Sequence, residues 1–101
     1  MIVEIIRYTI ASEDAGQFLA AYAAAGEVLR ASPFSLGFEL ARCVEDERSF
    51  ILRIEWPSVE AHLELFRKSP DFARFLEAIR PYIDRIEEMR HYAPVLVHRA
   101  R

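Results

Sequence analysis

The sequence predicts an α+β domain in which helices cover one face of an antiparallel sheet. Two kinds of periodicity support this prediction: segments with alternating side chains, and segments with apolar residues at helical spacing. They follow one another in the order strand, helix, strand, strand, helix, strand. A chain of 101 residues is long enough for one core, so residues 1–101 are expected to form one domain.

The first strand and helix occupy the N-terminal third. Val3 to Ile10 is rich in β-branched residues that alternate between two faces, which is typical of a strand. Ser12 is a candidate N-cap, and the two acids after it suit the positive end of a helix dipole. Ser32-Pro33 ends the helix. Its buried stripe is predicted to be Phe18, Tyr22, Ala25 and Leu29.

A hairpin is predicted from residues 34–43 and 48–56, around the acidic tip Glu45-Asp46-Glu47. A three-residue loop keeps the large apolar side chains on one face, whereas a two-residue loop would place Phe and Leu on the polar face. The cross-strand pairs that follow are Leu40–Leu52, Phe38–Ile54 and Glu39–Arg53.

The second helical region begins after Pro57 and divides in two. Ser58 is a good N-cap for the first piece, whose apolar face is predicted to be Val59, Leu63 and Phe66, with His62 beside it. Ser69-Pro70 restarts the helix, with Ser69 as its cap, and Pro81 closes it. The segment 83–97 is predicted to be the last strand, bent or at an edge near Pro94, because proline cannot donate to a ladder.

These elements give a ferredoxin-like β-α-β-β-α-β sheet with its aromatic side toward the helices. The other side mixes apolar and charged residues, and a lone monomer would expose Val3, Ile5 and Ile51 to water. We therefore predict a homodimer in which two such faces meet and the tail beyond Pro94 reaches the partner. The interface is expected to carry the ion pairs of Arg7, Glu39, Arg53 and Glu55.

Composition excludes several classes of partner. The net charge is −3 without a basic cluster, which argues against nucleic acid. The most apolar run, Ile2 to Ile10, contains Glu4 and Arg7, so no membrane segment is predicted. The lack of a leader pattern and the single cysteine, Cys43, favour a cytoplasmic location.

Two motifs point to a known family. The run Trp56-x-Ser58-x-Glu60-Ala61-His62 followed by Ser69-Pro70, and the closing Tyr92-x-Pro94-Val95, resemble the antibiotic biosynthesis monooxygenase (ABM) family of dimeric α+β barrels. The resemblance covers nearly the full chain. It implies a dimeric α+β barrel with a cleft between helices and sheet. It also implies oxidation of electron-rich aromatic substrates without a metal or flavin.

Six residues on the helix-facing side are candidates for this cleft. His62 and Tyr8 are the candidate catalytic residues, since a free histidine titrates near neutrality and a tyrosine can donate to a substrate oxygen. The candidate substrate-binding residues are Trp56, Tyr22, Phe66 and Phe38. Each also has a structural interpretation: Trp56 as a plug at the end of the sheet, His62 as a backbone hydrogen-bonding partner, and the tyrosines as residues of the core margin.

No metal or cofactor is expected. His91 and His98 lie far from His62 in sequence, and no second metal-type ligand is apparent near it. The haem-degrading branch of this superfamily combines a first-strand Asn, a strand-end Trp and a later helical His. Here the first strand offers Arg7 and Tyr8, and the region of Leu65 and Phe66 is apolar, so haem degradation is disfavoured.

The leading functional hypothesis is a cofactor-independent monooxygenase that acts on a quinol or hydroxylated polycyclic aromatic in the cleft. The alternative is a non-catalytic dimer that binds a small aromatic ligand or serves as an accessory protein, which the lack of a recognisable acid/base pair favours. A haem-handling protein is a third, weaker hypothesis.

Overall fold

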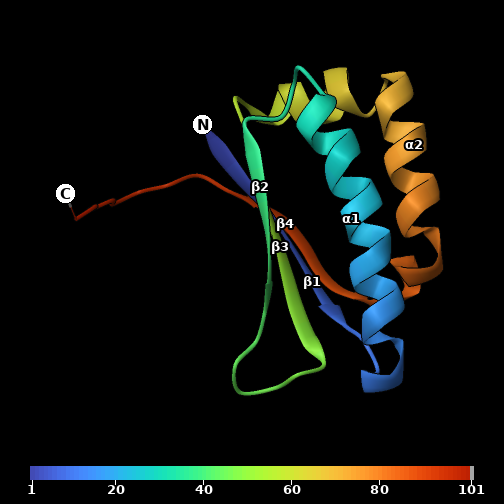
Figure 1. The fold of residues 1–101 in the computed structure, drawn as a ribbon. Coiled ribbons are helices and arrows are strands. Elements are labelled where there is room, and N and C mark those ends of the chain that lie inside the picture. The colour runs from blue at the N-terminus through green and yellow to red at the C-terminus, as the bar shows by residue number, and fades with distance from the viewer. Residues whose placement is uncertain (101) are drawn as a thin grey trace.

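The computed structural model describes residues 1–100 and shows one four-stranded antiparallel sheet with the helices on one side (Figure 1). The strand order is β2-β3-β1-β4. The strands are β1 (Ile2–Thr9), β2 (Gly37–Arg42), β3 (Ser49–Trp56) and β4 (Ile86–Tyr92). The helices are α1 (Ala15–Ala31) and α2 (Pro70–Ile79), with a π-helical segment at Ala61–Phe66 and 3-10 turns at Ser12–Asp14 and Arg80–Arg85. The predicted α+β class and order of elements are confirmed.

The predicted hairpin register is also confirmed. Leu40 pairs with Leu52, Glu39 with Arg53, and Phe38 with Ile54. Alternation of side chains fixes this register, because a slip of one residue would turn the apolar set of both strands toward water. The central strand β1 pairs with β3 on one side and with β4 on the other.

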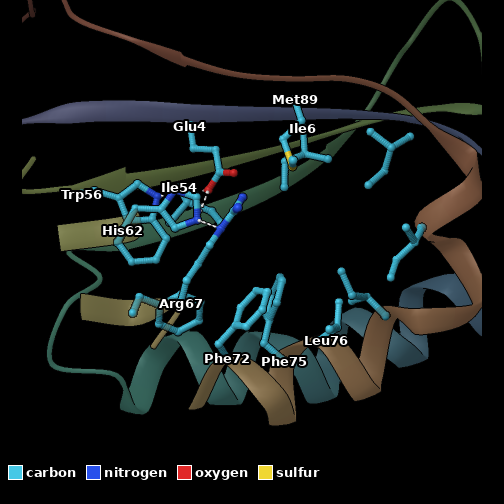
Figure 2. Close-up of a pocket in the computed structure, with 14 residues that line it drawn as sticks. Glu4, Ile6, Ile54, Trp56, His62, Arg67, Phe72, Phe75, Leu76 and Met89 are labelled. Atoms are coloured by element: carbon cyan, nitrogen blue, oxygen red, sulfur yellow. Dashed lines mark hydrogen bonds and ion pairs between the residues drawn. The ribbon is translucent and has the colours of Figure 1, made fainter. Parts of the chain in front are cut away.

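The core lies between the sheet and α1, and it is aromatic. The ring of Phe18 on α1 is 5.0 Å from that of Tyr8 and 4.9 Å from that of Phe50, in edge or tilted arrangements that add to the energy of burial. The four residues predicted for the α1 stripe are all buried. One polar residue interrupts the apolar side of β1: Glu4 is only 2% exposed (Figure 2).

The apolar face predicted for this helical region is confirmed at Phe66 and wrong at Val59. Val59 is 40% exposed, whereas His62 is buried together with Ala61 and Phe66. The backbone N–H of Arg67 donates to the carbonyl of His62 at 3.0 Å, five residues back. This turn is wider than an α-helical one. The predicted residue that is not buried, Val59, lies before the π-helical segment.

Of three predicted serine caps, one is confirmed. Ser58 Oγ accepts the backbone N–H of Ala61 at 3.1 Å. Ser69 stands at the N-cap position of α2, but its hydroxyl donates to the carbonyl of Phe66 at 2.7 Å and closes the preceding segment. Ser12 does not cap α1, because a 3-10 turn precedes the helix and its hydroxyl turns elsewhere.

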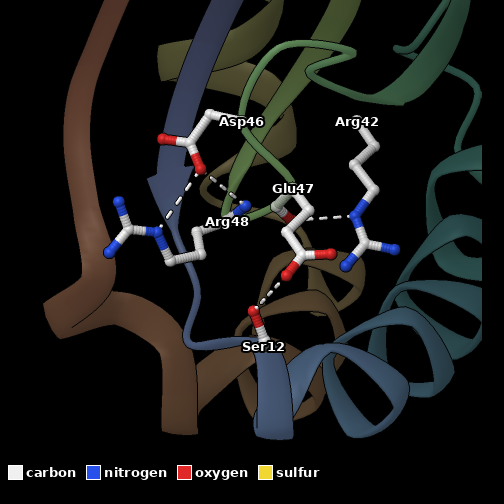
Figure 3. A network of polar contacts seen from close by, with 5 residues as sticks. All are labelled: Ser12, Arg42, Asp46, Glu47 and Arg48. Atoms are coloured by element: carbon white, nitrogen blue, oxygen red, sulfur yellow. Dashed lines mark hydrogen bonds and ion pairs between the residues drawn. The ribbon is translucent and has the colours of Figure 1, made fainter.

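The hydroxyl of Ser12 joins the start of the helical region to the acidic hairpin tip (Figure 3). It donates to Glu47 Oε1 at 2.8 Å, while Arg42 Nε donates to the carbonyl of the same residue at 2.8 Å. The backbone and side chain of Arg48 both donate to Asp46 Oδ1, which lowers the pKa of that carboxyl. The tip is therefore tied down by short-range polar contacts.

The last strand is shorter than predicted. Ile83 belongs to the 3-10 turn before β4, and the strand ends at Tyr92. Residues 93–100 leave the sheet without regular structure, and they carry Val95 and Leu96 at 98% and 94% exposure (Figure 1). Within residues 1–100, the structure has no helix with the length and apolar character needed to cross a membrane.

A glycine allows the close approach of α1 to β2. A Cβ on Gly26 would lie 2.8 Å from the end of the Phe38 ring, whereas one on Gly16 of the same helix would meet nothing within 4 Å. We expect Gly16→Ala to raise the free energy of unfolding by up to about 1 kcal/mol. The free energy of unfolding of Gly26→Ala is expected to be about 1–3 kcal/mol lower than that of Gly16→Ala, because the Phe38 ring must move. Urea unfolding measures both, and equal stability of the two variants would contradict the packing argument.

Candidate functional site

A cavity of about 220 Å³ lies between α2 and the helix-facing side of the sheet (Figure 2). Strands β1, β3 and β4, the π-helical segment and α2 all contribute to its wall. Most of the lining is aliphatic or aromatic, as with Ile6, Ile54, Phe66, Phe72 and Phe75. Three ionisable side chains, those of Glu4, His62 and Arg67, enter this apolar lining. They are the chemically distinctive part of the cavity.

Sheet pairing places Glu4 at the centre of the site. It occupies an inward position of β1, opposite Ile54 on β3 and His91 on β4. The indole Nε1–H of Trp56, at the end of β3, donates to Glu4 Oε1 at 3.1 Å. The second carboxyl oxygen points away from His62, toward the part of the cavity near Ile6 and Met89 (Figure 2). One oxygen is thus held by the protein and the other faces the cavity.

The π-helical segment brings His62 onto this carboxyl. The imidazole stacks on the indole of Trp56, with ring centres 4.6 Å apart and planes 11° from parallel. Its Nε2 is 3.5 Å from Glu4 Oε1 and 3.3 Å from Arg67 Nε. Its Nδ1 is 2.7 Å from His91 Nε2. Because π-helical turns occur often at functional sites, the irregular backbone here agrees with a site.

Burial shifts the pKa values of Glu4 and His62 in opposite directions. Loss of hydration raises the pKa of Glu4 to about 7, only partly offset by the Trp56 hydrogen bond and the charge of Arg67. The same burial, together with the nearby Arg67 and His91, lowers the pKa of His62 to about 4. Near neutral pH the imidazole is therefore uncharged, and Glu4 is the group that exchanges a proton.

The residues Glu4, His62 and His91 form a cluster of metal-type ligands, with donor atoms within 4.8 Å of one another. The prediction that no such ligand lies near His62 was therefore wrong, because antiparallel pairing sets His91 opposite Glu4. Both ring nitrogens of His62 already make hydrogen bonds, and the cationic Arg67 stands beside one of them. These contacts fit a hydrogen-bonded group of side chains that share protons better than they fit a cation-binding site.

The structure brings three of the six candidate site residues to the cavity, namely Trp56, His62 and Phe66. The hydroxyls of Tyr8 and Tyr22 instead hydrogen-bond each other in the core, away from the lining. Burial raises the pKa of Tyr8 to about 12 and raises that of Tyr22 as well. Phe38 packs on α1 and borders a separate depression.

Sequence reasoning missed Glu4, Arg67 and His91 as site residues. One signal for Glu4 was available, since it is the one charged residue among the inward positions of β1. A carboxyl on an apolar face is seldom buried without a role or a partner. No comparable signal marked His91, whose neighbours along the chain are polar.

The raised pKa of Glu4 predicts how stability changes with pH. The folded state holds this proton more tightly than the unfolded chain, whose glutamate pKa is near 4.5. The resulting stabilisation is complete below pH 4.5 and is lost as the pH rises through about 7, a change of about 3 kcal/mol. Glu4→Gln lacks this titration. The free energy of unfolding of the wild type should therefore fall by this amount relative to that of the variant between pH 4.5 and 8. The opposite contribution of His62 is common to both proteins.

Urea unfolding of wild type and Glu4→Gln across this pH range measures the difference. Glu13→Gln, which changes an exposed carboxyl, is the matched control. Parallel stability curves for wild type and Glu4→Gln would contradict the assignment of a buried carboxyl that titrates near neutrality.

Comparison with known proteins places this geometry in a family. The sequence model described as "Antibiotic biosynthesis monooxygenase" matches residues 1–78. None of the curated proteins matches the sequence. A candidate antibiotic biosynthesis monooxygenase from Bordetella bronchiseptica has a similar structure, with a TM-score of 0.77 and 24% identity over 94% of this chain and 97% of that one.

A variant of SnoaB, a cofactor-independent oxygenase from Streptomyces nogalater, is also similar in structure. Its TM-score is 0.76, at 16% identity over 95% of this chain and 94% of that chain. At such identities the structural likeness establishes the shared fold, and the sequence model establishes the family. By the match over residues 1–78, this chain belongs to the antibiotic biosynthesis monooxygenase family.

Proposed function

We propose that this protein is a monooxygenase that needs no cofactor and oxidises a quinol or hydroxylated polycyclic aromatic in the cavity. The observation that carries the proposal is the buried carboxyl of Glu4, which faces an otherwise apolar and aromatic cavity. Burial raises its pKa to about 7. Ionisation of a phenolic hydroxyl makes the ring electron-rich enough to react with oxygen. The likeness to a cofactor-independent oxygenase supports this assignment.

Glu4 is proposed to take the substrate proton. The phenolic O–H bond breaks and an O–H bond forms on the carboxyl oxygen that faces the cavity. A phenol has a pKa near 10, so transfer to a group with a pKa of about 7 is uphill by about 4 kcal/mol. The guanidinium of Arg67, which lines the same cavity, is placed to offset this cost by stabilising the phenolate.

The lining and the volume of the cavity limit which substrates fit. Trp56 and Phe66 belong to the lining, with His62 stacked on the indole. The cavity of about 220 Å³ is below the 300–1,000 Å³ common for drug-sized ligands. Among quinols and hydroxylated polycyclic aromatics, we therefore favour those with one ring or two fused rings over larger polycycles.

We also propose that the chain works as a homodimer through the sheet face that lacks helices. That face exposes Ile51 at 38% and carries an ion pair between Arg53 and Glu55, with Glu39 opposite Arg53 in register. Val3, which was predicted to be exposed in a single chain, is instead buried, and Ile5 is partly buried. Arg7 lies 3.9 Å from Glu88 on the same sheet. A second copy would cover the apolar positions of this face, and the exposed apolar tail beyond Pro94 would pack against it.

Oxygen uptake with one- and two-ring quinols tests the enzymatic proposal. We expect turnover by the wild type and a loss of about 100-fold or more in kcat for Glu4→Gln, because the proton acceptor is removed. Glu13→Gln should retain wild-type activity. If quinols raise the melting temperature without being consumed by any form, the alternative of a non-catalytic ligand-binding protein replaces the proposal.

Light scattering at micromolar concentration tests the homodimer. The wild type should have the mass of two chains, and Ile51→Arg should reduce it to that of one, because a charge would be buried against the partner. Leu19→Arg, which adds the same charge on the exposed side of α1, should stay dimeric. A wild type with the mass of one chain, or dissociation by both substitutions alike, would contradict the proposed interface.

A further inference from the structure

The contact between the two imidazoles of His62 and His91 determines where their protons lie. The atoms His62 Nδ1 and His91 Nε2 are 2.7 Å apart, and they come from the π-helical segment and β4. In a hydrogen bond between neutral imidazoles, one nitrogen carries the hydrogen and the other accepts it. The contact alone is compatible with either direction.

Arg67 settles the direction of this bond. Its Nε–H lies 3.3 Å from His62 Nε2, and a guanidinium can only donate. His62 Nε2 must therefore be the acceptor. A neutral imidazole has one N–H, so the proton of His62 is on Nδ1 and is donated to His91 Nε2. The hydrogen-bond network thus assigns the Nδ1–H tautomer to His62 and leaves His91 unprotonated at Nε2.

This tautomer matters for Glu4. The unprotonated Nε2 of His62 lies 3.5 Å from Glu4 Oε1, so the imidazole offers that oxygen no hydrogen. Within residues 1–100, the hydrogen bond that holds this carboxyl comes from the Trp56 N–H, and the carboxyl keeps its high affinity for a proton. In the other tautomer, an Nε2–H would donate to Glu4 and favour its ionised form. That hydrogen would also point at the N–H of Arg67, so the two donors would repel each other.

We infer that His91 is a positioning residue, which accepts the His62 Nδ1–H and so keeps the unprotonated Nε2 toward Glu4. The groups that face His62 are Glu4 from β1, Trp56 from β3, His91 from β4 and Arg67 from the end of its own segment. Among these, only His91 accepts from Nδ1. The inference rests on the proposed function where it links this tautomer to turnover, but the tautomer itself does not depend on it.

Two substitutions at one position test the inference. His91→Gln keeps an acceptor, the amide oxygen, but removes a group that can take up a proton, and His91→Leu removes both. The exposed His98 of the tail supplies the matched controls, His98→Gln and His98→Leu. Nitrogen-15 spectra of the histidine rings report the tautomer without any substrate, and the side-chain carbon of Glu4 reports its titration.

We expect His62 to be protonated at Nδ1 in the wild type, in His91→Gln and in both His98 variants. In His91→Leu, the other tautomer should be populated and the midpoint of the Glu4 titration should fall by about one unit or more, a tenfold change in proton affinity. With a quinol that is turned over, the pH–rate profile of His91→Gln should follow the wild type, and that of His91→Leu should shift with Glu4.

The outcomes separate the two proposals. Protonation of wild-type His62 at Nε2 would overturn the positioning role. If His91→Gln behaves like His91→Leu, the positioning role is also overturned, because the result indicates that His91 transfers a proton. The wild-type measurement needs no variant to fold. If no quinol is consumed but the tautomers are as expected, the positioning role of His91 stands and the oxygenase proposal fails.

Discussion

The hydrogen bond from the indole of Trp56 to the buried carboxyl of Glu4 is the interaction on which the site depends. A carboxyl that is 2% exposed is stable only if its polar atoms have partners, and the indole N–H supplies one. The bond also helps to orient the plane of the indole. The imidazole of His62 stacks on that plane, and His91 and Arg67 then bond to its two nitrogens.

One physical cause, removal from water, gives these groups their chemical character. It raises the pKa of Glu4 to about 7 and lowers that of His62 to about 4. The neutral imidazole then acts as a hydrogen-bonded support, and the carboxyl becomes the group that can exchange a proton near neutral pH. The apolar walls of the cavity therefore set the acid–base chemistry of the site as well as its shape.

The two faces of the sheet serve different purposes. The helix-facing side holds the aromatic core and the cavity, and there Gly26 allows the Phe38 ring to approach α1 closely. On the opposite side Ile51 is exposed in one chain, and so are the apolar residues of the tail beyond Pro94. The proposed dimer would cover these surfaces while leaving the cavity beneath the helices of each copy.

The order of elements, the hairpin register and the family motifs could be predicted from the sequence, because alternation, proline positions and the Ser58 cap act over short distances. It did not determine the partners of Ser12 and Ser69, since several acceptors compete for a hydroxyl and only packing selects one. The sequence predicted Trp56, His62 and Phe66 as site residues, but the rest of the site depends on tertiary structure. Strand pairing joins Glu4, Trp56 and His91 across the chain, a π-turn rotates His62 onto them, and burial sets their proton affinities.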